Sequence, residues 1–190
     1  MLKQLTSILL IGWLLAGCAS QQTQLNTSTK TLERPAQGQV LVHFIRANDF
    51  SNKTAAIYNR ENYLVSLNKG EHFTYATTPG RHVFMVTGGT PDVMTASLEA
   101  NKVYFVHVKP TLGALKVNFD FKPYTVIDPK KKAQAQLWMQ ETNAVTVSAE
   151  GKAWAAQHAA QAKAAFDETY SDFLKRKSED RTHIYKEDGL

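Results

Sequence analysis

The sequence is poor in cysteine: among its 190 residues, Cys18 is the only one. A single thiol cannot form an internal disulfide, which excludes the small secreted domains that are held together by disulfide bonds. In an oxidising compartment a free thiol is a liability. The chain is therefore expected either to stay in the cytosol or to carry a chemically blocked Cys18.

The motifs of several enzyme classes are also missing. The sequence contains no His-Glu-x-x-His, no pair of cysteines, no Gly-x-Ser-x-Gly and no phosphate-binding loop. Its net charge of +5 and pI near 9.2 are well short of a strongly basic nucleic-acid-binding domain. We therefore expect no catalytic residue, no metal site and no nucleic-acid partner.

Long hydrophobic runs are missing as well. The apolar run from Leu5 to Ala16 has about 12 residues, whereas a helix that spans a bilayer needs roughly 20. Lys3 precedes the run, and polar residues follow it at once. This arrangement is typical of a secretory signal, and it predicts a signal peptide over residues 1–17.

The end of this run has a recognisable pattern. Leu15-Ala16-Gly17-Cys18 resembles the bacterial lipobox, Leu-[Ala/Ser]-[Gly/Ala]-Cys, at every position. The resemblance implies cleavage between Gly17 and Cys18, a diacylglycerol group on the Cys18 sulfur and an acyl group on its new amine, with no other cofactor. It also implies a membrane partner reached through this anchor. Two or more acyl chains hold a protein stably on a membrane.

The residue after Cys18 bears on location. Lipoproteins of this kind that stay in the inner membrane usually carry Asp directly after the cysteine, whereas this chain has Ala19. The resemblance therefore implies attachment to a bacterial outer membrane, facing the periplasm.

The amino-acid composition of the mature chain changes at residue 40. Residues 18–39 are rich in Gln, Thr, Ser and Asn without apolar periodicity, which predicts a flexible, lipidated tether. Residues 40–127 contain short β-branched and aromatic runs, separated by turn signals such as Asn68–Gly70 and Thr78–Gly80. Such spacing predicts an antiparallel β-sandwich of about 7–9 strands.

The remainder predicts helices, so that the fold class is mainly β with C-terminal helices (α+β). Residues 128–178 form the helical extension, with a first helix over Lys130–Gln140, one more strand over Asn143–Ser148, and a long helix after Ser148. Residues 179–190 are expected to be a flexible tail. The long helix carries an apolar stripe that is expected to pack on the sandwich, or alternatively to contact a partner helix. The stripe consists of Trp154, His158, Ala162, Phe166, Tyr170, Phe173 and Leu174.

The β segment resembles the bacterial lipoproteins catalogued as domain of unknown function 2846. Its motifs, over roughly residues 39–125, are Arg46 with Phe50, then Leu67, Gly70 and Phe73, the turn Pro79-Gly80-Arg81-His82, and Tyr104-Phe105-Val106. The Pro-Gly-x-His turn also resembles the PEGA-type β-sandwich, and the sandwich is expected to be transthyretin/PEGA-like. The family's usual glycine in the first hairpin is replaced here by Arg60-Glu61. The resemblance implies a fold and a location, and no catalytic residues.

Two kinds of candidate site follow from the residues themselves. Basic clusters could contact an anionic surface, or could simply be solvated helix ends; they are Lys130, Lys131 and Lys132, and Lys175, Arg176 and Lys177. Three histidines fall on expected strands, where a metal could bring them together, although surface or half-buried histidines are the favoured interpretation; they are His43, His82 and His107.

The favoured function is a lipid-anchored envelope lipoprotein whose β-sandwich is a non-catalytic binding or assembly module for an envelope protein or the cell wall. One alternative is an envelope hydrolase that acts on cell-wall glycan or peptide, and would need two facing carboxylates. Another is an inhibitor or chaperone of an envelope protein, with a stoichiometric partner.

Overall fold

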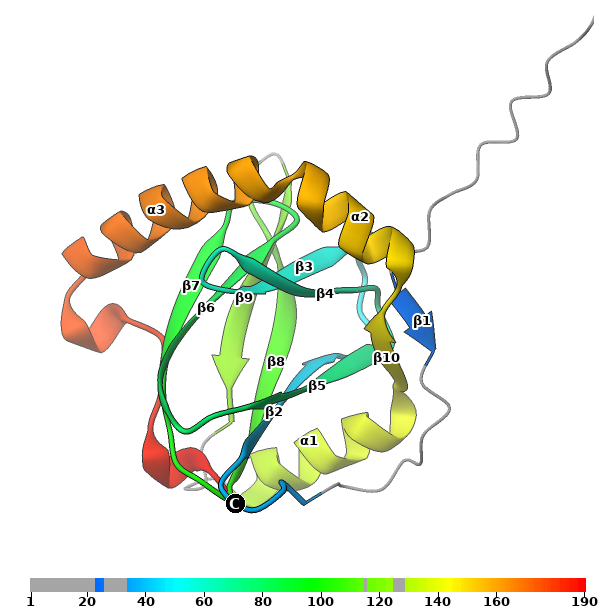
Figure 1. Ribbon diagram of the computed structural model, residues 1–190, viewed down its shortest axis with the longest axis vertical. Coiled ribbons are helices and arrows are strands. Elements are labelled where there is room, and N and C mark those ends of the chain that lie inside the picture. The colour runs from blue at the N-terminus through cyan, green and yellow to red at the C-terminus, as the bar shows by residue number, and fades with distance from the viewer. Residues whose placement is uncertain (1–22, 26–33, 115, 125–128) are drawn as a thin grey trace, which may run out of the picture.

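Two β-sheets pack face to face, and helices cover the outer face of each (Figure 1). The computed structural model describes residues 23–25, 34–114, 116–124 and 129–190. Helix α1 (Pro129–Glu141) lies on one side of the strands, and helices α2 (Ala149–Gln157) and α3 (Ala159–Lys175) lie on the other. The predicted class, mainly β with C-terminal helices, is confirmed.

The larger sheet has six strands, and the smaller sheet has five. In spatial order the larger sheet contains β1 (Thr23–Leu25), β10 (Asn143–Val147), β5 (Glu71–Thr77), β2 (Val40–Arg46), β8 (Val103–Leu112) and β9 (Val117–Pro123). The smaller sheet contains β11 (His183–Ile184), β7 (Asp92–Leu98), β6 (Gly80–Thr87), β3 (Ala55–Asn59) and β4 (Asn62–Leu67). Strands β2 to β9 thus lie within the range predicted for the sandwich.

Strand β2 shows how the layers are built, because every one of its residues is buried. Val42 and Phe44 point into the core between the sheets. Leu41 and Ile45 point the other way and pack beneath α1. A strand that is covered on both faces reads as a continuous apolar run rather than as an alternation, which is the pattern of the sequence VLVHFIR.

The apolar stripe of the C-terminal helices covers the other sheet, as predicted. Phe166 and Phe173 are buried against Met85 and Val93 on the outer face of β6 and β7. The stripe belongs to two helices instead of one, because the chain leaves helical geometry at His158 (φ −103°, ψ 7°). Leu174, at the end of the stripe, is exposed. None of the helices in the described part of the chain is both long and apolar enough to cross a bilayer.

The expectation of a purely antiparallel sandwich is wrong in one respect. Strand β2 pairs in parallel with β8, and the late strands β10 and β11 join β5 and β7 in parallel. A parallel pair needs a crossover of a dozen residues or more. Here the strands between β2 and β8 supply the crossover, so no helix is required between them.

The expectation of a flexible tail over residues 179–190 is also wrong. Ile184 is 1% exposed, and its strand β11 pairs with the edge of β7. Leu190 exchanges two backbone hydrogen bonds with Val103, at 3.0 and 3.1 Å. Two short 3-10 turns, η1 (Ser178–Asp180) and η2 (Lys186–Asp188), flank β11. Buried Ile184, backbone pairing and hydrogen bonds from Lys102 and Tyr104 to the Lys186 carbonyl hold the tail, and none of these produces a periodic sequence pattern.

The range expected as a tether also contains structure. Residues Thr23–Leu25 form β1, which pairs antiparallel with β10 and places Thr23 opposite Val147. This pairing ties the chain to the edge of the larger sheet five residues after Cys18.

Four turns meet at one end of the sandwich, which we call the loop end. They follow β2, β4, β6 and β8, and they lie together because Arg46 pairs with Glu71, Ala55 with Leu67 and Val86 with Asp92. The turns approach closely: a Cβ on Gly88 would lie 2.5 Å from the carbonyl oxygen of Thr54. Glycine is therefore required where the turn after β6 meets the turn after β2.

Arg46 is the fully buried cation that holds this end together. Its Nε donates to Asp49 Oδ2 at 2.9 Å, and its guanidinium lies 4.7 Å from the centre of the Phe119 ring. Its other nitrogens donate to three carbonyl oxygens, which belong to Ser51 (2.7 Å), Leu67 (2.9 Å) and Lys53. One side chain thus joins the turn after β2 to β4 and β9.

We predict that Asp49→Ala lowers the free energy of unfolding by about 3 kcal/mol, because it leaves the buried Arg46 charge without its counter-ion. Urea titration would measure the change. The matched control is Asp172→Ala, which removes an exposed ion pair with Lys175 and should change the stability by less than about 0.5 kcal/mol. Equal effects of the two substitutions would show that the buried pair has no special role.

Candidate functional site

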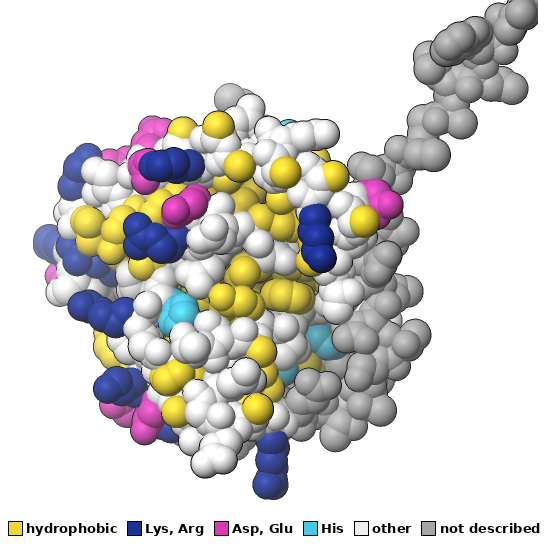
Figure 2. All heavy atoms as spheres, in the orientation of Figure 1, with side chains coloured by type: hydrophobic (Ala, Val, Ile, Leu, Met, Phe, Trp, Pro, Cys, Tyr) yellow, Lys and Arg dark blue, Asp and Glu magenta, His cyan; other side chains and the backbone are white. Residues whose placement is uncertain are grey.

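A groove of about 360 Å³ lies between the β3–β4 hairpin and helices α2 and α3. It sits at the end of these strands that is opposite to the loop end. Figure 2 shows hydrophobic side chains gathered in this region below α2 and α3, with basic and acidic side chains around them. The lining residues are Tyr58, Glu61, Asn62, Tyr63, Val147, Lys152, Ala155, Ala159 and Ala162.

The hairpin that forms one wall turns at Arg60 and Glu61. Arg60 has a positive φ of 54°, a conformation that favours glycine in a two-residue hairpin. Two contacts hold Arg60 there: its N–H donates to the Val83 carbonyl at 2.7 Å, and its guanidinium lies 5.0 Å from the centre of the Phe166 ring. Arg60 therefore ties the hairpin to β6 and to α3.

The helical wall begins at Ser148, which caps α2 as predicted. Its Oγ accepts a hydrogen bond from the Gly151 N–H at 3.0 Å. The wall then presents alanines where the groove is open, Ala155 from α2 and Ala159 and Ala162 from α3. Small side chains leave the space that larger residues would fill, so the helices stand away from the hairpin at this point.

Aromatic contacts fix the floor. The ring of Tyr63 lies 5.7 Å from that of Tyr58 and 5.7 Å from that of Trp154, measured between centroids. The Tyr63 hydroxyl donates to Ser66 Oγ at 2.9 Å. Trp154 in turn stacks on His158 at 4.4 Å. The tyrosine rings are therefore held in place before any ligand arrives.

The lining is electrically neutral except at its rim. Burial raises the pKa of both Tyr58 and Tyr63, so the two phenols stay protonated at neutral pH. The charged lining residues are Glu61, whose side chain is 40% exposed, and Lys152, which is exposed. This arrangement suits an apolar group in the groove and a polar or charged group at its edge.

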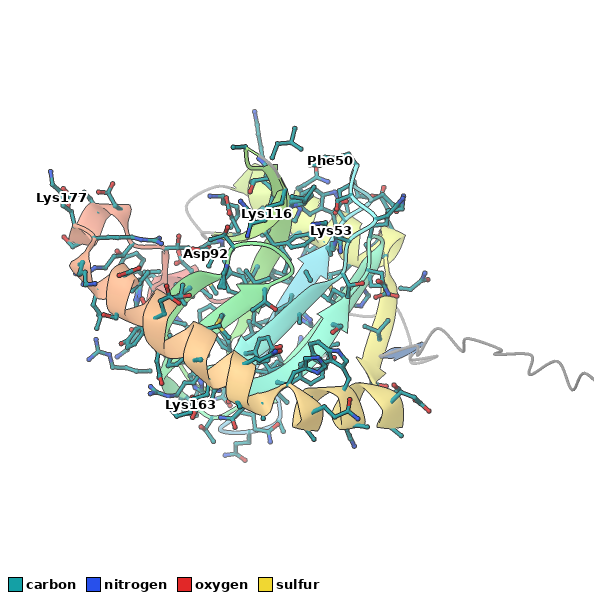
Figure 3. All side chains as sticks on the ribbon, turned by 90° about the horizontal axis from the view of Figure 1, so that it is seen from above. Phe50, Lys53, Asp92, Lys116, Lys163 and Lys177 are labelled. Atoms are coloured by element: carbon teal, nitrogen blue, oxygen red, sulfur yellow. The ribbon has the colours of Figure 1, made fainter. Side chains whose placement is uncertain are left out.

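The basic cluster at the end of α3 is only partly available for an anionic surface. Lys175 Nζ donates to Asp172 at 2.8 Å, and Arg176 lies 3.7 Å from Asp92. Lys177 is exposed two residues after the end of α3, away from Phe50 and Lys116 (Figure 3).

The other basic cluster lies on a different face. Lys130 is exposed at the start of α1, which covers the larger sheet, whereas α3 covers the smaller one. The side chains of Lys131 and Lys132 lie outside the described residues, as do Gly17 and Cys18. The structure therefore does not join the two clusters into one basic surface.

The three histidines considered for a metal are not brought together. His43 and His107 lie beneath α1, where they pack against Phe105 and Trp138 at 5.1 and 4.4 Å. His82 lies in the smaller sheet, stacked on Phe84. Among the residues that the structure describes, no three metal-ligating side chains form a group that could hold an ion.

A third histidine, His72, lies on the same side of the larger sheet as His43 and His107. His72 faces α1 from β5, with Nδ1 2.7 Å from Thr142 Oγ1. His43 Nδ1 lies 2.9 Å from Thr74 Oγ1, whereas its buried Nε2 has no hydrogen-bond partner in the described part of the chain. Burial lowers the pKa of His43, His72 and His107 to about 4. All three imidazoles are therefore neutral at physiological pH.

Four carboxylates on loops or at strand ends make contacts within the fold. Asp49 pairs with Arg46, and Glu61 lies 3.6 Å from Arg60. Glu71 accepts from the Asn68 N–H at 2.7 Å, and Asp92 accepts from the Phe121 N–H at 3.3 Å.

Sequence reasoning missed the groove. Tyr58 and Tyr63 read as strand residues, and the alanines read as the flanks of a packing stripe. The spacing of Ala155, Ala159 and Ala162 places them on one helical face, and this run of small residues is the signal that could have indicated an opening.

Compared with known protein families and with curated proteins, the sequence gives no match. The resemblance to domain of unknown function 2846 therefore stays a prediction.

We predict that the free energy of unfolding falls by several kcal/mol as the pH drops from about 6.5 to about 4. In this window the unfolded chain binds protons at His43, His72 and His107 that the folded chain does not, so acid favours unfolding. Urea titrations at several pH values would measure the slope. His107→Phe, which keeps a ring against Trp138, should reduce the slope; an unchanged slope would contradict the prediction.

Proposed function

We propose that this chain is a lipid-anchored bacterial envelope lipoprotein whose sandwich and C-terminal helices form a non-catalytic binding module. The observation that carries the binding role is the groove between the β3–β4 hairpin and α2–α3, with its neutral aromatic and alanine lining and its charged rim. Aromatic rings and alanine methyl groups bind apolar groups well.

The anchor is supported by the signal peptide pattern and by the lipobox match at Leu15-Ala16-Gly17-Cys18. In this proposal Cys18 carries a diacylglycerol thioether and an N-acyl group, and the mature protein resides on the periplasmic side of the outer membrane. Each buried methylene stabilises membrane attachment by about 0.8 kcal/mol, so two or three chains hold the protein stably.

The groove is of the right kind to receive part of an envelope protein or of the cell wall. Its floor accepts an apolar side chain or a similar group, and Glu61 and Lys152 can each pair with a charge on the ligand. The preformed floor lowers the entropy cost of binding, because Tyr58 and Tyr63 are already held by their neighbours.

The lipid anchor has a direct test. We predict that Cys18→Ala abolishes incorporation of labelled fatty acid and leaves an uncleaved or soluble precursor, because both acylation and processing require the thiol. Fractionation and mass measurement of the N-terminal peptide would record the result. A mutant that still takes up label and fractionates with the membrane would refute the anchor.

The groove is tested separately, with a photo-crosslinking residue in place of Glu61 in intact cells. We predict a discrete adduct that is lost on Ala159→Trp, since the indole fills the groove. The matched control is Ala160→Trp on the same turn, because Ala160 is exposed and does not line the groove. An adduct that survives Ala159→Trp would place the partner elsewhere. No adduct, combined with turnover of a cell-wall substrate, would favour the hydrolase.

A further inference from the structure

The loop end of the sandwich exposes two large apolar side chains. Phe50, in the turn after β2, is 62% exposed, and Leu112, at the end of β8, is 79% exposed. These are the two most exposed large hydrophobic residues in the described part of the chain. They occur on two turns of the same end, although single exposed apolar residues are common anywhere on a surface.

The two turns are held rigidly side by side. Arg46 binds the carbonyls of Ser51 and Lys53 and lies over Phe119, which belongs to the β8–β9 hairpin. Gly88, in the turn after β6, lies against both segments, since a Cβ there would lie 2.5 Å from the Thr54 carbonyl oxygen and 2.8 Å from the Phe119 ring. Phe50 is therefore presented outward, between Asp49 and Ser51, whose polar groups take part in the Arg46 network.

Four lysines are exposed at the same end of the sandwich. Figure 3 shows Phe50, Lys53 and Lys116 at the same edge of the molecule, away from α3. Lys69 and Lys109 are exposed on the turn after β4 and near the end of β8. Within the described ranges, none of these four lysines forms an ion pair, whereas three aspartates of this end already have basic neighbours. Those pairs are Asp49 with Arg46, Asp92 with Arg176 and Asp120 with Lys122.

We infer that the loop end docks on an anionic phospholipid surface, with Phe50 and Leu112 inserted at the boundary between headgroups and acyl chains and the lysines on the headgroups. Protruding apolar residues with exposed lysines at the same end are the combination that binds such an interface. A protein partner, in contrast, is expected to contact a broad, flat surface and to form hydrogen bonds across it. Here the apolar side chains project from narrow turns.

The position of β1 is compatible with this orientation, a point that rests on the proposed anchor at Cys18. Thr23 lies opposite Val147, four residues along β10 from Asn143, which is next to Gly70 at the loop end. That separation is about 13 Å, and the five residues from Cys18 to Thr23 reach about 17 Å when extended. The anchor can therefore reach the membrane that the loop end contacts.

The test is hydrogen exchange of the full chain, followed by peptide mass spectrometry, with and without vesicles of phosphatidylethanolamine and phosphatidylglycerol. We predict that exchange slows severalfold in the turn after β2 and in the β8–β9 hairpin, and that it is unchanged along α3. Vesicles of phosphatidylcholine, or high salt, should largely remove the effect, because screening weakens the attraction of the lysines.

Matched variants separate the two contributions. Phe50→Ser with Leu112→Ser should abolish the slowing, whereas Leu174→Ser, which alters an exposed leucine on α3, should not. Lys53→Glu with Lys116→Glu should largely remove the vesicle-dependent slowing, whereas Lys163→Glu on α3 with Lys177→Glu just after it should leave the slowing intact. Unaltered exchange at the loop end, equal slowing on phosphatidylcholine, or loss of slowing in the control variants would overturn the inference.

The inference about the loop end and the proposed lipid anchor at Cys18 can fail separately. If the mass of the N-terminal peptide shows no acyl group but the loop end is still protected by vesicles, the inference stands and the proposed anchor fails. If Cys18 is acylated but the loop end exchanges freely on vesicles, the anchor stands and the inference fails.

Discussion

The buried guanidinium of Arg46 is the interaction on which the loop end depends. A charge in the core is costly unless it is paired and fully hydrogen-bonded. Arg46 meets that demand with Asp49 and with carbonyls from three different residues. Each of these acceptors must stay in place, since moving one leaves a buried donor unsatisfied. The arginine thereby converts a long turn into a fixed support for Phe50.

Strand β2, which ends at Arg46, also constrains the rest of the fold. Because β2 is buried on both faces, the larger sheet needs a cover on its outer side, and α1 provides it through Ala135 and Met139. The histidines beneath α1 fill this layer as neutral rings, with Trp138 against His107. The smaller sheet needs a cover as well, and α3 provides it. The groove is the space that remains between the helices and the β3–β4 hairpin. The proposed binding surface therefore arises where the helices do not pack fully against the smaller sheet.

Local features were readable from the sequence, and long-range ones were not. The Pro79-Gly80 turn is predicted by residue type, and Gly80 has the expected positive φ of 128°. Ser148 is recognisable as a helix cap because the capping contact spans three residues. The parallel pairing of β2 with β8 and the docking of Ile184 join residues far apart in the chain. The groove was not predicted for another reason. The sequence does not distinguish an alanine that flanks a packed stripe from an alanine that lines an opening.

The two proposed surfaces lie at opposite ends of strands β3 and β4, and this separation assigns them different environments. Ala55 and Leu67 are at the loop end, whereas Tyr58 and Tyr63 reach the groove at the other end of the hairpin. If Phe50 and Leu112 rest on the membrane, the groove faces away from it. A soluble or wall-bound partner then reaches Glu61 and Lys152 without crossing the lipid headgroups.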